Sequence, residues 1–132
     1  MNPYEHHVQI YYEDTDHSGV VYHANYLKYF ERAREHMLGI TELVRLFQEE
    51  AIGFVVYKAD LTYKKGARFG DILHIRTQVQ IHSPYRLLFR QTAHRPADNI
   101  DLVDANIQLA CVKRDQLIKI PSSVLHKLNH LS

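Results

Sequence analysis

The residues best suited to chemistry form an acidic turn near the amino-terminal end of the sequence, Asp14-Thr15-Asp16-His17-Ser18-Gly19. A carboxylate in such a turn can act as a nucleophile or as a general base that activates a water molecule. A helical pattern follows, and between Val20 and Tyr26 no Ser, Thr or Asp is available to cap its start, which leaves only Asn25 for that role. The free N–H groups and the positive dipole end of a helix stabilise an anion. The sequence therefore places a carboxylate just before an uncapped helix start.

The acidic turn also fits parts of three other kinds of site. A calcium loop matches its first, third and sixth positions, but Asn25 stands at the twelfth, where a bidentate glutamate is required. A phosphatase with Asp-x-Asp after a strand needs a parallel α/β sheet, whereas antiparallel strands dominate this chain after residue 50. A transition metal site would use His17 and His23 with Asp14 or Asp16, but their spacing is no compact ligand motif. This last alternative stays open from the sequence.

The spacing of apolar residues predicts the elements that must position the turn. From Tyr22 to Gly39 apolar residues recur every three or four positions, which predicts a helix with one buried face and Gly39 at its end. Thr41 is expected to cap a second, shorter helix that runs to about Glu50. Pro121 is expected to open a short final helix. Strands are predicted over residues 8–12, 52–63, 72–81, 85–93 and 103–111.

These elements predict one domain over residues 1–132 with an α+β fold. A long helix and a set of alternating strands bury their apolar faces together when an antiparallel sheet of about five strands wraps around one central helix. An open sheet leaves edge strands, and an edge with the apolar pattern of residues 52–57 favours pairing with a second copy. We expect a homo-oligomer built on a dimer, either the dimer itself or a dimer of dimers, that is, a homotetramer.

Composition narrows the class of protein. The 132 residues are 45% hydrophobic and 23% charged with a net charge of +1, which excludes disorder and coiled coil and argues against a nucleic-acid-binding partner. Cys111 is the only cysteine, so no intrachain disulfide forms, and its apolar strand position predicts a small buried hydrophobe. The sequence has no apolar stretch of about 18 residues and no signal-peptide pattern. We expect a cytoplasmic protein without stable membrane insertion.

One stretch combines an acid, a glycine, aromatic residues and a helix start at set offsets. It consists of Gln9-Ile10, Thr15-Asp16, Gly19-Val20-Val21-Tyr22-His23-Ala24-Asn25-Tyr26 and Leu27-Lys28-Tyr29-Phe30-Glu31-Arg32-Ala33-Arg34. This stretch resembles the signature of the 4-hydroxybenzoyl-CoA thioesterases, and within that superfamily it is most similar to the YbgC-type acyl-CoA thioesterases. The resemblance implies the hot-dog fold, in which a sheet wraps around a long helix, and hydrolysis of an acyl-CoA to a free acid and CoA.

The same resemblance implies roles for single residues. Asp16 would be the catalytic carboxylate, and the main-chain N–H of His23 would help bind the thioester carbonyl. Gly19 would let the backbone turn sharply between the acid and the helix, while Tyr22 and Tyr26 are candidates to line the acyl pocket. Tyr26 also belongs to the apolar helix stripe, which favours a core position. No metal or organic cofactor is implied, and direct attack by Asp16 and general-base action on water both stay open.

The expected substrate is a short-chain or aromatic acyl-CoA, with an acyl-carrier-protein thioester as a second candidate. The alternative function is a non-catalytic module that binds an acyl-CoA or an acyl-carrier protein, because one fold hosts several functions. A dehydratase would need a catalytic histidine on the central helix, which offers only His36 near its far end. The phosphates of CoA call for a basic rim, for which the candidates are Lys64, Lys65 and Arg68, then Arg86 with Arg90, then Lys113 with Arg114.

Overall fold

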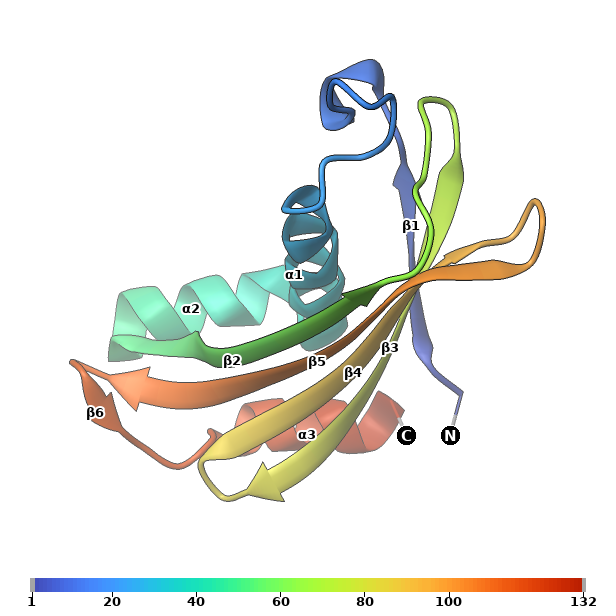
Figure 1. The fold of residues 1–132 in the computed structure, drawn as a ribbon. Coiled ribbons are helices and arrows are strands. Elements are labelled where there is room, and N and C mark those ends of the chain that lie inside the picture. The colour runs from blue at the N-terminus through green and yellow to red at the C-terminus, as the bar shows by residue number, and fades with distance from the viewer. Residues whose placement is uncertain (1, 132) are drawn as a thin grey trace.

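The computed structural model describes residues 2–131, which form a six-stranded antiparallel sheet and three α-helices. The strand order is β1-β3-β4-β5-β2, and β6 pairs with β5. Figure 1 shows the sheet curling around α1, as the α+β prediction requires. In chain order the elements are β1 (Tyr4–Gln9), the 3-10 turn η1 (Tyr12–Asp14), α1 (Asn25–Leu38), α2 (Ile40–Glu50), β2 (Ile52–Tyr63), β3 (Ile72–Ser83), β4 (Arg86–Arg95), β5 (Ile100–Lys113), β6 (Gln116–Leu117) and α3 (Ser122–Leu131).

The first strand lies earlier in the chain than residues 8–12. Strand β1 ends at Gln9, and Tyr12–Asp14 forms η1 instead of continuing the strand. The carboxylate of Asp14 accepts a hydrogen bond from the Tyr11 N–H at 2.7 Å, which folds this segment back on itself. A local side-chain bond of this kind competes with strand pairing.

Helix α1 follows the predicted apolar stripe but starts at Asn25, because the preceding residues form a turn in which the Asn25 N–H donates to the Tyr22 carbonyl at 2.9 Å. Its stripe residues are buried in the core, and Gly39 ends the helix at a φ of +96°. The cap predicted at Thr41 is wrong: α2 begins at Ile40 with Gly39 before it, so Thr41 lies inside the helix. A glycine with positive φ joins the two helices directly and leaves no room for a separate cap.

A buried polar group fixes α1 against the sheet. The Arg34 guanidinium on α1 is 5% exposed and donates to the side-chain oxygen of Gln91 on β4 at 2.9 Å. The Gln91 amide nitrogen donates to the Thr77 hydroxyl on β3 at 2.9 Å and to the Phe30 carbonyl at 3.0 Å. Burial lowers the pKa of Arg34. The Arg34–Gln91 pair is hydrogen-bonded both to α1 and to the sheet, so it sets the position of α1 over β3 and β4.

Strand β2, which carries the apolar pattern of residues 52–57, is an edge of the sheet. Its side chains Val55, Val56 and Tyr57 are 46%, 48% and 43% exposed. The register with β5 shifts between Val56 and Lys58, which marks a bulge at this position. An apolar edge strand of this length presents unpaired backbone groups to a partner strand.

One expectation from composition is met in residues 2–131. Cys111 is fully buried in β5, and burial raises the pKa of its thiol to about 11, which is the behaviour of a small core residue. None of the helices in this range is long and apolar enough to cross a membrane.

Candidate active site

A tight loop between η1 and α1 presents Asp16. Thr15 and Val21 form an isolated antiparallel bridge, and the Asp16 N–H donates to the Val20 carbonyl at 2.9 Å. The Gly19 N–H returns to the Asp16 carbonyl at 3.0 Å, with Gly19 at a φ of +80°. Only glycine adopts this conformation without strain, so Gly19 makes the turn that was expected of it.

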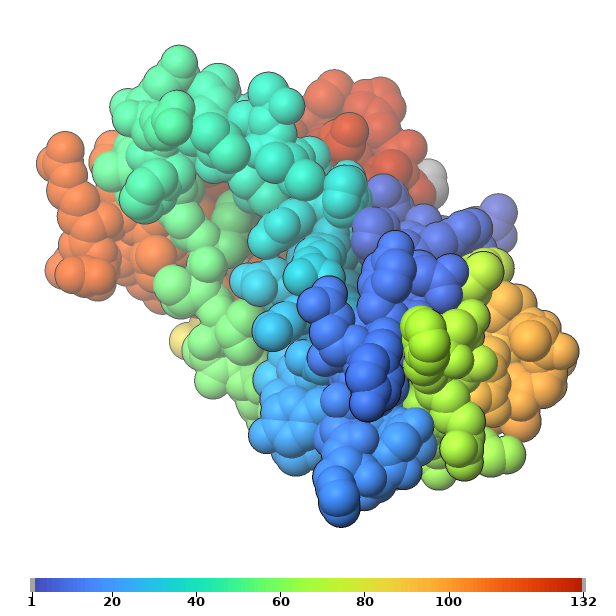
Figure 2. All heavy atoms as spheres, turned by 90° about the horizontal axis from the view of Figure 1, so that it is seen from above, coloured from blue at the N-terminus to red at the C-terminus, as the bar shows by residue number. Residues whose placement is uncertain are grey.

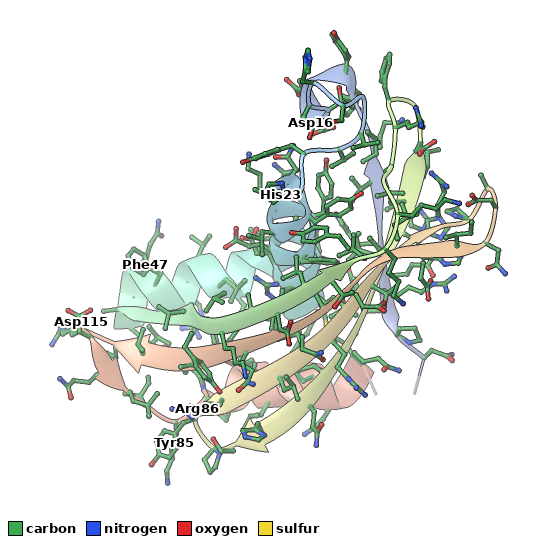
Figure 3. All side chains as sticks on the ribbon, in the orientation of Figure 1. Asp16, His23, Phe47, Tyr85, Arg86 and Asp115 are labelled. Atoms are coloured by element: carbon green, nitrogen blue, oxygen red, sulfur yellow. The ribbon has the colours of Figure 1, made fainter. Side chains whose placement is uncertain are left out.

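The Asp16 side chain is exposed, and one of its oxygens accepts a hydrogen bond from the Ser18 N–H at 2.8 Å. Figure 3 shows Asp16 beyond the amino-terminal end of α1, with His23 at the start of the helix. This backbone bond orients the carboxylate of an exposed residue. Asp16 is therefore positioned and accessible, as a nucleophile or general base must be.

The start of α1 carries no side-chain cap, as the sequence indicated. The residue before the helix is Ala24, and the side chain of Asn25 donates instead to the Asp14 carbonyl at 2.9 Å. The Tyr22 N–H donates to the same carbonyl at 2.9 Å, which ties the acidic turn to the helix start. Among residues 2–131 the His23 N–H has no hydrogen-bond acceptor. The positive end of the helix dipole and this free N–H therefore lie at the same end of α1 as the acidic turn.

Tyr63 at the end of β2 holds the helix start, a role that sequence reasoning missed. Its hydroxyl donates to the His23 carbonyl at 2.9 Å, and its ring meets the exposed His23 ring edge-on at 6.0 Å. The two residues are 40 positions apart, so no local pattern signals the contact. Tyr63 fixes the direction of the peptide bonds at the start of α1.

The two tyrosines proposed to line the pocket lie in different places. Tyr22 is exposed, with its ring 4.5 Å from that of His23, so it borders the site. Tyr26 is only 2% exposed and packs in the core against Tyr29 and Tyr63. Its hydroxyl has no hydrogen-bond partner among the described residues, and burial raises its pKa. The structure thus brings Asp16, Gly19, Tyr22 and His23 together at the surface and places Tyr26 beneath them.

The connection over residues 64–71 packs against the acidic loop. The Ala67 carbonyl accepts the Val21 N–H at 2.9 Å, and a Cβ at Gly66 would lie 2.7 Å from a methyl carbon of Val20. Figure 2 shows this connection, in yellow-green, beside the blue segment that precedes α1. The exposed Lys65 and Arg68 belong to it. Of the three basic groups predicted from the sequence, this is the one that contacts the acidic loop.

Lys64, at the start of this connection, pairs instead with Asp104 at 2.5 Å. The other two basic groups lie elsewhere, and the Arg86 guanidinium sits 4.6 Å from the centre of the Tyr57 ring. Figure 3 shows Arg86, and Asp115 in the turn that follows Lys113 and Arg114, at the end of the molecule opposite Asp16.

The transition metal alternative for this loop finds no support. Among residues 2–131, Asp14, Asp16, His17 and His23 form no group of three or more ligands within reach of one ion. Asp14 is instead structural, because its carboxylate accepts the Tyr11 N–H and its carbonyl accepts two further N–H donors.

The pKa of the buried Tyr29 hydroxyl is raised, first by burial and then by the negative charge of the nearby Asp14 carboxylate.

Comparison with known proteins identifies what this arrangement is similar to. Residues 11–128 match the thioesterase-like superfamily. The acyl-CoA thioesterase YbgC of Haemophilus influenzae is 35% identical over 94% of this chain and 93% of its own length. The acyl-CoA thioester hydrolase YbgC of Escherichia coli is 39% identical over 80% of this chain and 78% of its own. A 1,4-dihydroxy-2-naphthoyl-CoA thioesterase from Synechocystis superposes with a TM-score of 0.90 at 20% identity, covering 97% of this chain and 96% of its own, and confirms the hot-dog fold.

Proposed function

Because this chain belongs to the YbgC family of acyl-CoA thioesterases within the thioesterase-like superfamily, we propose that it hydrolyses acyl-CoA thioesters to a free acid and CoA, with Asp16 as the catalytic carboxylate. The observation that carries the proposal is the exposed Asp16 held next to an uncapped helix start. Attack on a thioester moves negative charge onto the carbonyl oxygen. The His23 N–H and the positive end of α1 would stabilise that charge without rearrangement.

Two routes use this geometry. In the first, an Asp16 oxygen bonds to the thioester carbon, the C–S bond breaks, CoA leaves as the thiolate, and water then opens the mixed anhydride. In the second, Asp16 takes a proton from water as the water attacks the carbon, and the C–S bond breaks in the same way. After a single turnover in ¹⁸O-labelled water, label in the Asp16 carboxylate identifies the first route, because it enters there only when water opens the anhydride at the Asp16 carbonyl carbon.

The CoA end of the substrate would lie toward residues 64–71. The exposed Lys65 and Arg68 are the basic side chains of the connection that touches the acidic loop. Cationic side chains bind phosphate oxygens through charge-assisted hydrogen bonds. We propose short-chain or aromatic acyl-CoA as the substrate class, with acyl-carrier-protein thioesters as the second class to test.

The working unit would be a homo-oligomer built on β2, as a dimer or a dimer of dimers. The exposed Val55, Val56 and Tyr57 on this edge strand support the proposal. A second copy would pair the edge and cover these side chains. Light scattering after size-exclusion chromatography tests it, and a monomer at micromolar concentration would refute it.

The decisive experiment measures thiol release from a panel of short, medium, long and aromatic acyl-CoAs. Asp16→Asn keeps an oxygen for the Ser18 N–H but cannot act as base or nucleophile, so we expect hydrolysis to fall by at least about 100-fold. Asp115→Asn is the matched control, since Asp115 is exposed at the far end of the molecule. Equal loss in both variants, or full activity in Asp16→Asn, would refute the role of Asp16. An inactive wild type on every CoA and carrier-protein thioester would favour the binding module.

A further inference from the structure

The outer face of β1 carries a group of metal-ligating side chains outside the site described above. Glu5 and His7 are two residues apart on β1 and so share one face of the strand. His7 lies directly opposite His74 in the β1–β3 register, which brings His74 to the same face. His6, between Glu5 and His7, points the other way and stacks on His36 of α1 at 4.8 Å. The sheet geometry itself therefore gathers these three side chains.

The three side chains converge on one point. A single carboxylate oxygen of Glu5 lies 3.0 Å from Nε2 of His7 and 3.0 Å from Nδ1 of His74. The two rings stack at 3.9 Å with an interplanar angle of 10°. The second Glu5 oxygen faces Nε of Arg76 at 3.6 Å, so the first oxygen is the one left for the group. All three ligand atoms lie within 4.8 Å of one another.

We propose that Glu5, His7 and His74 form a binding site for a divalent transition metal ion of the zinc class. Zinc takes imidazole nitrogen and carboxylate oxygen at about 2.0–2.2 Å, which puts tetrahedral ligand atoms about 3.3 Å apart. The two separations of 3.0 Å from the Glu5 oxygen lie within a few tenths of an ångström of this value. Because an imidazole lone pair lies in the plane of its ring and the two rings are stacked in parallel, the His7 and His74 side chains must rotate out of the stack to point at one ion. The exposed surroundings leave the fourth position to water.

A metal ion bound by Glu5, His7 and His74 would hold the edge strand β1 against β3. β1 is the edge of the sheet opposite β2, and the site joins it to β3 through side chains as well as backbone bonds. The chain continues from β1 through Ile10 into η1 and the loop that holds Asp16. The metal would stabilise this segment without touching the proposed reaction, so the two proposals fail independently.

Zinc titration by calorimetry tests the site. The Nε2 atoms of His126 and His130 lie 3.0 Å apart on α3 and form a competing pair, so every variant is made in the His126→Ala/His130→Ala background. We expect this background protein to bind one equivalent of Zn²⁺. Adding His7→Ala/His74→Ala should weaken binding by about 100-fold or more, at 1.4 kcal/mol for each tenfold. Adding His6→Ala, the neighbour on the opposite face, should leave it unchanged.

Two further measurements test whether Glu5 and the two histidines themselves bind the metal ion. Glu5→Gln changes an exposed side chain without altering its size, and we expect it to weaken Zn²⁺ binding and to change the visible d–d spectrum of bound Co²⁺. Zn²⁺ should also slow amide hydrogen exchange in Tyr4–Gln9 of the background protein only when His7 and His74 are present. No binding by the background protein at about 100 µM Zn²⁺ overturns the proposal. So does binding that survives His7→Ala/His74→Ala.

Discussion

Replacing Gly66 with alanine tests whether the 64–71 connection holds the loop that carries Asp16 in place. An ideal Cβ at Gly66 would lie 2.7 Å from one γ-carbon of Val20 and 2.9 Å from its β-carbon. The Val20 carbonyl accepts the Asp16 N–H, so any shift of Val20 passes directly to Asp16. The substitution adds one methyl group to a closely packed contact without changing charge.

The size of the expected effect follows from the overlap between the new Cβ at Gly66 and the Val20 side chain. Ordinary carbon contacts begin at about 3.5 Å, so Val20 must retreat by roughly 0.8 Å. Overpacking of this kind costs about 1–3 kcal/mol of folding stability. Misplacing a catalytic group by about 1 Å costs on the order of 100-fold in rate, so we expect kcat/KM to fall by about 10- to 100-fold.

Thermal unfolding and thiol-release kinetics on the same preparations provide the assay. Gly53→Ala is the control, because a Cβ at Gly53 meets nothing within 4 Å. Val20→Ala in the Gly66→Ala background removes the nearest γ-carbon and should restore part of both losses. A Gly66→Ala protein with wild-type stability and activity would refute the idea that this contact positions Asp16.

Three other predictions follow from single contacts. Tyr63→Phe removes the hydrogen bond to the His23 carbonyl and should cost about 0.5–1.5 kcal/mol in urea unfolding, with a modest loss of kcat/KM; unchanged stability would contradict it. Arg34→Met leaves the buried Gln91 oxygen without its charged donor and should cost about 1.5–3 kcal/mol by the same measurement, whereas a stabilised variant would show that the charge is a net burden. Because burial raises the pKa of the Cys111 thiol from 9.0 to about 11, the unfolded chain ionises first, and this thiol's contribution to stability should be lost as the pH rises from 9 to 11. Comparison with Cys111→Ala over that range checks it, and identical pH profiles would refute it.

The spacing of residues in the sequence was sufficient to predict a helix or strand where a single local pattern determines that element. The stripe through Phe30 and Ala33 places α1, the strand-forming residues of 52–63 place β2, and the alternation in residues 103–111 places β5. It failed where a side chain competes with the backbone. Aromatic residues at 11 and 12 favour a strand, but the Asp14 carboxylate binds the Tyr11 N–H and makes η1 instead. The two-residue strand β6 is too short for any period to indicate.

The candidate site likewise has parts that the sequence predicts and parts that it does not. Asp16, Gly19 and the uncapped helix start are near one another in the chain, so their spacing is sufficient to bring them together. Tyr63 and the 64–71 connection reach the site only through the pairing of distant strands. No local pattern contains that information, and the depth at which Tyr26 lies depends on the same long-range packing.

The two carboxylates of the acidic turn are two residues apart in the sequence but have different surroundings in the fold. Asp14 is partly buried, its carboxylate binds a backbone N–H, and its carbonyl receives both Tyr22 and Asn25. Through these hydrogen bonds Asp14 joins the turn to α1, so its carboxylate is not free to approach a substrate. Asp16 has a single backbone donor and faces solvent beside the helix start. Chemistry requires a carboxylate that is held but still available, which supports assigning the reaction to Asp16 and the scaffold to Asp14.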